Sequence, residues 1–126
     1  MIQQQTFLKV VDNSGAKTVK CIQILGGFKK RYACLGNYIV VSIKQIKNKS
    51  KKISRVRKKE VYIALIIKTK LKVWTKPGCT KTFGYNAVIL LNKQKNPIGT
   101  RILTSLPSKL KKKKSQKIIN LSLGLI

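Results

Sequence analysis

The chain has 126 residues, of which 29 are Lys or Arg, two are Asp or Glu and none is His, so its formal net charge is +27. A hydrophobic fraction of 43% is ordinary for a globular protein, which excludes a purely disordered basic tail and predicts one domain over residues 1–126 with a real core. With so few acids the positive charges repel one another unless a polyanion binds, so we expect a permanent polyanionic partner.

Nucleic acid is the expected polyanion, rather than a membrane surface. No run approaches the ~18 consecutive apolar residues that a membrane-spanning helix needs. No long amphipathic helix with a basic face and an aromatic-rich opposite face can be drawn either. We therefore expect no membrane partner.

The first predicted element is a β-hairpin around a polar turn. Two apolar runs, residues 7–11 and 19–25, flank the turn residues 12–16. Asp12 can bond the backbone two residues on, and Gly15 can take a positive φ without steric cost, so the chain can reverse here. We expect two strands joined by this turn, with Asp12 serving as a turn residue.

The pattern of apolar and polar side chains predicts how the next strands face. In the second strand of the hairpin, Ile24 is expected to point away from Val19 and Cys21. Residues 38–46 alternate more cleanly and predict a strand with one apolar face. Residues 61–67 are an almost continuous apolar run rich in β-branched side chains, which indicates a central strand covered on both faces.

Later turns divide the rest of the chain. Residues 70–74 are expected to continue the sheet as an edge strand, and the turn at 76–79 leads to a hairpin partner that includes residues 87–91. A reversal at 96–100 precedes a brief strand at 101–103. Strands at such short intervals, with little helix before the end, predict a mainly β fold, a small β-barrel.

The C-terminal basic segment, from about residue 105 to residue 126, differs in character. Residues 105–108 are typical of the start of a helix, whereas residues 111–114 are four adjacent lysines whose mutual repulsion disfavours an isolated helix. The apolar residues that follow position 117 are expected to pack back on the domain.

Clustered cations form the candidate RNA-binding sites. The loop 47–59 carries eight cations in 13 residues with no acid among them, and neutralising phosphates with such a cluster gives an affinity that falls with salt. The alternative is a solvated basic loop. Tyr32 either stacks on a base or sugar or packs in the core or at its rim, and Trp74 either lies on RNA or caps the barrel. The residues predicted to bind RNA are Lys29, Lys30, Arg31, Tyr32, Lys47, Lys49, Lys51, Lys52, Arg55, Arg57, Lys70, Lys72, Lys76, Lys111, Lys112, Lys113 and Lys114.

The residue sets of common enzymes and metal sites are missing. Asp12 and Glu60 are the only carboxylates, there is no His, and no G-x-x-x-x-G-K-[ST] loop occurs. Cys21, Cys34 and Cys79 include no C-x-x-C pair and are expected to be reduced thiols. We therefore expect no enzyme activity, no metal and no cofactor, and we interpret Glu60 as a residue at the start of a strand that pairs with a neighbouring cation.

Several motifs together resemble those of a known family. In chain order they are Met1-Ile2-Gln3, Asp12-Asn13-Ser14-Gly15-Ala16, Leu25-Gly26-Gly27, Arg31-Tyr32-Ala33, Leu91-Asn92 and Pro97-Ile98-Gly99-Thr100-Arg101. Their order and spacing resemble those of ribosomal protein fourteen of the large subunit, in its bacterial and organellar form. The resemblance covers nearly the whole chain.

The resemblance implies a fold and a function. The fold would be a five-stranded β-barrel with a basic hairpin extension and a short helical C-terminal segment. The protein would be a structural constituent of the large ribosomal subunit in translation, bound to large-subunit rRNA near the subunit interface, neighbouring ribosomal proteins and, across the interface, small-subunit rRNA. Thr100, Arg101 and Lys117 match the docking face of a ribosome-silencing factor. The alternative is a free regulatory β-barrel that binds single-stranded RNA or a protein partner transiently.

Amino-acid usage bears on where the protein works. Lys outnumbers Arg by 25 to 4 and Ile occurs 16 times, which is typical of an A+T-rich gene. Residues 1–5 have neither the apolar block of a secretory signal nor an Arg-rich presequence. We expect an organelle-encoded protein of the ribosome in the mitochondrial matrix, with a plastid or the cytoplasm of an A+T-rich bacterium as alternatives.

Overall fold

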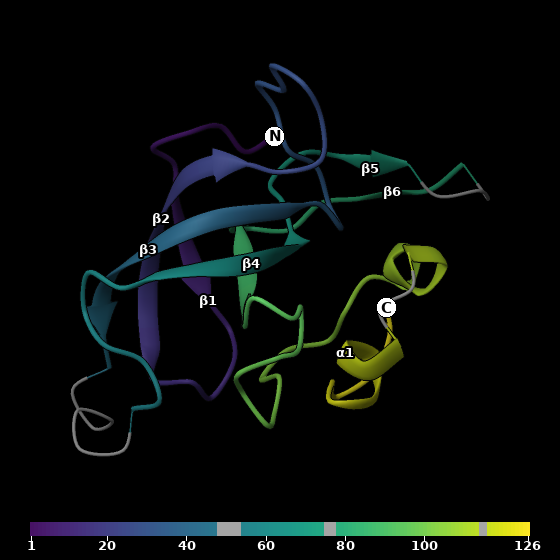
Figure 1. Cartoon of the computed structure of the whole chain (residues 1–126). Helices are drawn as coiled ribbons and strands as arrows, with labels where there is room; N and C mark the ends of the chain where they lie inside the picture. The colour runs from purple at the N-terminus through teal and green to yellow at the C-terminus, as the bar shows by residue number, and fades with distance from the viewer. Residues whose placement is uncertain (48–53, 75–77, 114–115) are drawn as a thin grey trace.

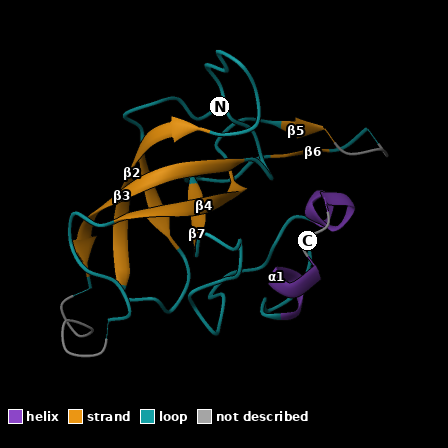
Figure 2. Cartoon of the chain, viewed as in Figure 1, coloured by secondary structure: helices purple, strands orange, loops and turns teal. Residues whose placement is uncertain are grey.

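The centre of the protein is a closed barrel of five strands. In this computed structural model, which describes residues 1–47, 54–74, 78–113 and 116–126, the strands are ordered β1-β2-β3-β4-β7 around the barrel (Figure 1 and Figure 2). Neighbours are antiparallel except β1 and β7, which run parallel and close the barrel. The prediction of a small, mainly β barrel is confirmed. The barrel strands are β1 (Phe7–Val10), β2 (Ala16–Ile24), β3 (Tyr38–Ile46), β4 (Val61–Lys68) and β7 (Ala87–Leu91).

The predicted hairpin between the first two strands is confirmed. Strands β1 and β2 pair with Leu8 opposite Val19, and both side chains are buried in the barrel interior. At the turn, Gly15 has a φ of +100°, a left-handed conformation that would strain a residue with a side chain. The glycine in the polar turn therefore allows the reversal.

The predicted orientation of Ile24 is wrong because strand β2 is irregular. The pairing of β2 with β3 shifts register between Cys21 and Gln23, as a β-bulge does when one strand carries an extra residue. The shift turns Ile24 to the same side as Val19 and Cys21, and all three are buried in the interior. Alternation along one strand assumes an unbroken ladder and cannot show this shift.

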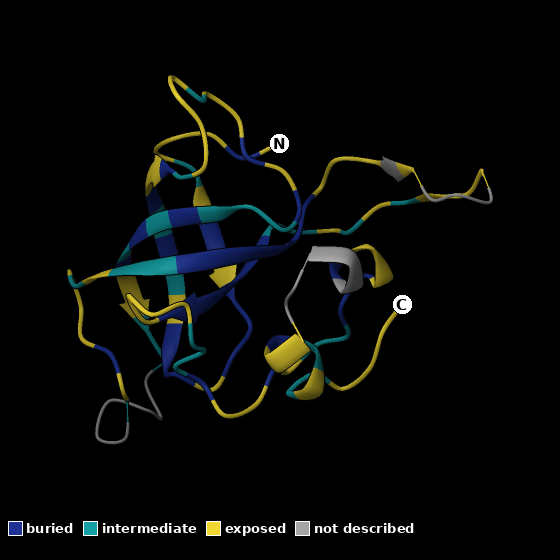
Figure 3. Ribbon diagram, turned by 45° about the vertical axis from the view of Figure 1, so that its right-hand side comes forward, coloured by how far each residue is buried: buried dark blue, intermediate teal, exposed yellow. Residues whose placement is uncertain are grey.

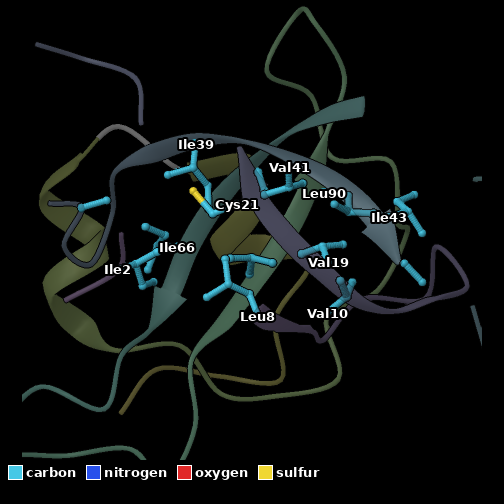
Figure 4. Close-up of a cluster of buried hydrophobic side chains, with 14 of the residues drawn as sticks. Ile2, Leu8, Val10, Val19, Cys21, Ile39, Val41, Ile43, Ile66 and Leu90 are labelled. Carbon is cyan, nitrogen blue, oxygen red and sulfur yellow. The ribbon is translucent and has the colours of Figure 1, made fainter. Parts of the chain in front are cut away.

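Strands β3 and β4 are the two strands that the sequence predicted at residues 38–46 and 61–67. Strand β3 buries its alternate residues between 39 and 43 in the interior cluster shown in Figure 4. Strand β4 is covered on both faces, because Ala64 and Ile66 lie in that interior cluster whereas Leu65 and Ile67 lie in a second cluster of buried residues. The dark-blue strands in Figure 3 show how far this burial extends.

The C-terminal segment packs on the second cluster. It contains the 3-10 helix η2 (Ser108–Lys113) and the helix α1 (Gln116–Asn120), and it buries Leu106, Leu110 and Ile118 there. The predicted helical segment is thus confirmed. The predicted packing of the apolar residues after position 117 holds for Ile118, with Ile119 and Leu121 half-buried, whereas Leu123 is 78% exposed. Within the described part of the chain, no helix has the length and apolar character to cross a bilayer.

The edge strand predicted at residues 70–74 does not join the barrel sheet. A separate two-stranded sheet forms instead from β5 (Val73–Trp74) and β6 (Thr80–Lys81), and it projects from the barrel as a hairpin (Figure 1). Both sides of β4 already pair, with β3 and with β7, so no free edge is left for this stretch. Strand β7 is accordingly a barrel strand, not the hairpin partner that was predicted.

The hairpin turn lies partly outside the described residues, which exclude 75–77. Gly78 has a φ of +79°, as the predicted type II turn requires at its glycine position. At the base of the hairpin, the Lys70 backbone N–H donates to the Asn86 side-chain oxygen at 2.9 Å.

The strand predicted at residues 101–103 is reduced to a single β-bridge between Ile102 and Asp12. The Ile102 backbone N–H donates to the carbonyl of Leu121 at 3.0 Å. This stretch therefore joins the first turn to the C-terminal segment and extends no ladder.

Asp12 does more than shape its turn. Its side chain is fully buried, and one carboxylate oxygen accepts from the backbone N–H of Ser14 at 2.9 Å and from the Ser14 hydroxyl. The other oxygen accepts from the backbone N–H of Leu90 at 2.9 Å. The carboxylate thus fixes the first hairpin to strand β7, the strand that closes the barrel.

We expect Asp12→Ala to lower the free energy of unfolding by about 3 kcal/mol, because the buried N–H of Leu90 loses a charged acceptor that no water replaces. Urea unfolding followed by circular dichroism measures the change. Lys17→Gln, on an exposed side chain near the same turn, is the control and should stay within about 0.5 kcal/mol of the native protein. Equal stability of Asp12→Ala and the control would contradict this role of Asp12.

Candidate nucleic-acid interface

The predicted RNA-binding residues lie at both ends of the barrel rather than in one patch. Strand β3 runs from the loop that holds residues 29–32 to the loop that holds residues 47–59, so the two loops leave opposite ends of this strand (Figure 1). Strand β4 returns to the first end, where residues 70–74 begin the β5–β6 hairpin. RNA that meets all three segments must approach the barrel from two directions.

The loop after β2 borders a cationic hollow of about 440 Å³. It lies between this loop, the N-terminal turn and the end of β2, and it is lined by the cations Lys29, Lys30 and Arg31 and the amides Gln3, Gln4 and Gln23. Ammonium and guanidinium groups bind phosphate, and amide side chains both donate and accept hydrogen bonds. The hollow can therefore receive a phosphate together with a polar base or sugar edge.

The same loop carries two exposed aromatic side chains. Phe28 is 93% exposed and Tyr32 is 46% exposed, so Tyr32 is not a core residue. The ammonium of Lys29 lies 5.5 Å from the centroid of the Phe28 ring. The loop thus offers rings for base stacking next to cations for phosphates, as single-stranded RNA sites do.

Two cations of the loop 47–59 are engaged within the protein. The Arg55 guanidinium donates to the carbonyl of Ile98 at 2.8 Å, and its backbone N–H donates to the carbonyl of Ser14 at 3.1 Å. The ammonium of Lys47 lies 3.5 Å from the carbonyl of Asp12. Both residues therefore fasten the base of the loop to the first turn, whatever phosphates they also meet.

Glu60 holds the end of this loop through hydrogen bonds. Its carboxylate accepts from the Tyr62 hydroxyl at 2.7 Å and from the Arg57 backbone N–H at 3.0 Å, and these two bonds lower the pKa of Glu60. Burial, with the bond to this carboxylate, raises the pKa of Tyr62 to about 12. The predicted neighbouring cation is Arg57, whose charge also lowers the pKa of Glu60, although its bond to the carboxylate comes from the backbone N–H and its side chain stays exposed.

The base of the β5–β6 hairpin presents cations and an aromatic ring to solvent. Lys70 and Lys72 are exposed, and Trp74 is 69% exposed, so the alternative in which Trp74 caps the barrel is wrong. Trp74 lines a hollow of about 240 Å³ together with Met1 and Leu71. This end of the barrel thus combines an apolar surface with flanking charge.

Some predicted RNA-binding residues cannot be placed in full. The backbone of three C-terminal lysines forms part of η2, namely Lys111, Lys112 and Lys113. Five other predicted residues lie outside the described part of the chain: Lys49, Lys51, Lys52, Lys76 and Lys114.

Two asparagine side chains link the three residues of the predicted protein-partner face to the loop 96–101. The Asn13 side-chain oxygen accepts from the backbone N–H groups of Thr100 at 2.8 Å and Arg101 at 3.2 Å, and its amide donates to the Thr100 hydroxyl at 2.8 Å. The ammonium of Lys117 donates to the Asn96 side chain at 3.3 Å. Thr100, Arg101 and Lys117 are all exposed, so this face is accessible.

Sequence reasoning missed the residues that position these surfaces. Asn13 and Asn96 hold the partner face, and Val56 is buried in the barrel interior from within the basic loop. A signal for Val56 existed, because it is an apolar side chain between two arginines. Nothing in the sequence indicated that the Asn13 side chain would bond the backbone of Thr100 and Arg101. Among the described residues, no three His, Cys, Asp or Glu side chains gather as a metal site would need.

We expect Gly99→Ala to lower the free energy of unfolding by about 1–3 kcal/mol, as overpacking does. A β-carbon at Gly99 would lie 2.8 Å from the Asn13 side-chain oxygen, so Asn13 must move and weaken its bonds to Thr100 and Arg101. Urea unfolding and amide hydrogen exchange at Thr100 measure both effects. Gly84→Ala is the matched control, because nothing lies within 4 Å of its added carbon; equal behaviour of the two variants would refute the contact.

We expect one tyrosine to ionise near pH 12 in an absorbance titration at alkaline pH, and this step to vanish in Tyr62→Phe. The folded pKa of Tyr62, about 12, lies above its ordinary value of 10.0, so its stabilising contribution is complete below pH 10 and is lost as the pH rises through 12. Glu60→Gln removes the carboxylate and should move the step to lower pH. If the step lost in Tyr62→Phe lies near pH 10, or if Glu60→Gln leaves the step near pH 12 in place, the pair does not form.

A comparison with protein families gives one finding. A family model described as ribosomal protein L14p/L23e matches the chain over residues 1–126. The match includes every element of the barrel and the C-terminal segment, and it agrees with the resemblance carried by the sequence motifs.

Proposed function

Because the chain belongs to the ribosomal protein L14p/L23e family, it is a structural protein of the large ribosomal subunit, and we propose that its basic loops bind large-subunit rRNA near the subunit interface. Membership also implies contacts with other ribosomal proteins. The observation that carries the proposal is a net charge of +27 in a chain whose two acidic side chains both bond groups of the protein itself. Asp12 accepts hydrogen bonds from Ser14 and Leu90, and Glu60 accepts them from Arg57 and Tyr62.

The mode of binding follows from the position of the loops. Cations at both ends of the barrel can neutralise phosphates of separate RNA segments, releasing counterions from each. Such contacts fix the position and orientation of the protein and read RNA shape rather than base sequence. The barrel separates the two ends, because its five strands pair with one another in a closed sheet.

The face made by Thr100, Arg101 and Lys117 is the proposed docking site for a ribosome-silencing factor at the subunit interface, where small-subunit rRNA also approaches. The support is structural, since Asn13 bonds the Thr100 hydroxyl and the backbone N–H groups of Thr100 and Arg101, and Asn96 bonds the Lys117 ammonium. A polar, preorganised face of this kind favours a reversible partner.

The proposed location is the ribosome of the mitochondrial matrix. It is supported by the excess of Lys over Arg and by the abundance of Ile, both of which follow from an A+T-rich gene. A plastid and an A+T-rich bacterium are the alternatives, and the base composition and genetic code of the gene distinguish the three.

Co-sedimentation with large subunits tests the proposed function. We expect stoichiometric recovery after a moderate salt wash, whereas complete release would favour the free regulatory barrel. Joint replacement of Lys29, Lys30 and Arg31 by Gln should cause release at lower salt, because each lost phosphate contact flattens the slope of log affinity against log salt by about 0.7–0.9. Lys93→Gln, which alters an exposed lysine outside these segments, should leave the salt dependence nearly unchanged.

A further inference from the structure

We propose that an unpaired stretch of RNA binds the outer surface formed by β1, β2 and the segment before β7. This surface, which we name the aromatic–lysine face, consists of Phe7, Lys9, Lys20, Phe83 and Tyr85, and the buried Lys68 contacts the last two of its rings. None of these residues belongs to the basic loops considered above. The inference rests on the proposed function, because it adds a second kind of contact with ribosomal RNA.

The face begins on the β1–β2 hairpin. Phe7 is paired with Lys20 across the two strands, and the ammonium of Lys20 lies 5.7 Å from the centroid of the Phe7 ring. Lys9 follows two positions after Phe7 and therefore points to the same side of the strand. Its ammonium lies 5.0 Å from the centroid of the Tyr85 ring, which continues the row toward β7.

Lys68, on strand β4, is buried next to two rings of the face. It is only 7% exposed, yet its ammonium lies 5.3 Å from the centroid of Phe83 and 5.6 Å from that of Tyr85. Burying a cation is unfavourable unless a counter-charge or polarisable group compensates. Here two aromatic rings compensate in part.

Among the described residues, no Asp or Glu side chain meets these lysines. The Asp12 carboxylate accepts hydrogen bonds from Ser14 and Leu90, and the Glu60 carboxylate accepts one from the Arg57 backbone N–H in the loop before β4. Three ammonium groups among three rings therefore lack a counterion from the protein itself. A phosphate backbone supplies that negative charge, and its bases supply flat partners for the rings.

Phe83 and Tyr85 are half-buried, and Tyr85 packs against the second cluster of buried residues, whereas Phe7 is accessible. Its side chain is 61% exposed, so this large apolar group is left in solvent. A cation–π contact at an exposed site is weaker than the stacking of a base on an aromatic ring. A base can thus replace the ammonium over the ring, and the ammonium that it frees can reach the adjoining phosphate.

Unpaired RNA fits this surface better than a duplex does. The bases of an A-form helix are stacked on one another and cannot lie on a protein ring, whereas the bases of loops and bulges can. The rings carry few polar groups that would read base edges, so we expect little sequence preference. An acidic protein segment would satisfy the lysines but would leave the rings without a specific role.

The experiment uses the full chain and a short fluorescent oligouridylate. Joint Phe7→Leu and Tyr85→Leu substitution should weaken binding by about tenfold for each ring while leaving the salt slope unchanged. Phe7→Tyr with Tyr85→Phe keeps both rings and should bind as the native protein does. Lys9→Gln with Lys20→Gln should instead flatten the salt slope by about 0.7 for each lost contact.

Two results would overturn the inference. One is native affinity for oligouridylate in the leucine variant; the other is equally weakened binding in the leucine variant and in Phe7→Tyr with Tyr85→Phe, which keeps both rings. Co-sedimentation of the same variants with large subunits distinguishes failure of this inference from failure of the proposed function. If the proposed function is wrong, the native protein itself is released from the subunits by the salt wash. Phe7→Leu alone, at an exposed position, keeps the test decisive should Tyr85→Leu reduce folding.

Discussion

The buried carboxylate of Asp12 joins parts of the chain that are far apart in sequence. It accepts hydrogen bonds from Ser14 in its own turn and from Leu90 in strand β7. The backbone carbonyl of Asp12 accepts from the Lys47 ammonium at the start of the basic loop. The neighbouring Asn13 fixes the loop that carries Thr100. One polar turn therefore closes the barrel and positions both the basic loop and the partner face.

Using both acids inside the fold has a consequence for the surface. The remaining cations have no carboxylate to neutralise them, so the free energy of their repulsion favours a polyanionic partner. The apolar core is built separately, from alternating side chains in the barrel and from a second cluster beneath the C-terminal segment. Charge and packing can therefore serve different purposes in one small domain: the core sets the shape, and the lysines and arginines set the partner.

Particular residues show where sequence reasoning succeeds and where it stops. Strand β3 could be predicted to the residue, because its alternation is regular and the glycine turn before it is clear. The side to which Ile24 points could not be predicted, because a register shift in the β2–β3 pairing reverses the direction of its side chain. The sequence allowed Trp74 either to cap the barrel or to lie on the surface. It is exposed because β5 belongs to a separate two-stranded sheet outside the barrel. Arg55 looked like a phosphate contact, although its guanidinium bonds the carbonyl of Ile98.

Composition, local periodicity and motifs along the chain were enough to infer the class of fold, the lack of common catalytic residue sets, the expectation of a polyanionic partner and the family resemblance. The tertiary structure alone decided that Asp12 reaches Leu90, that the basic loops leave opposite ends of the barrel, and that Phe7, Tyr85 and two lysines share one face. Those relations depend on strand register and on contacts between distant residues, which local patterns do not encode.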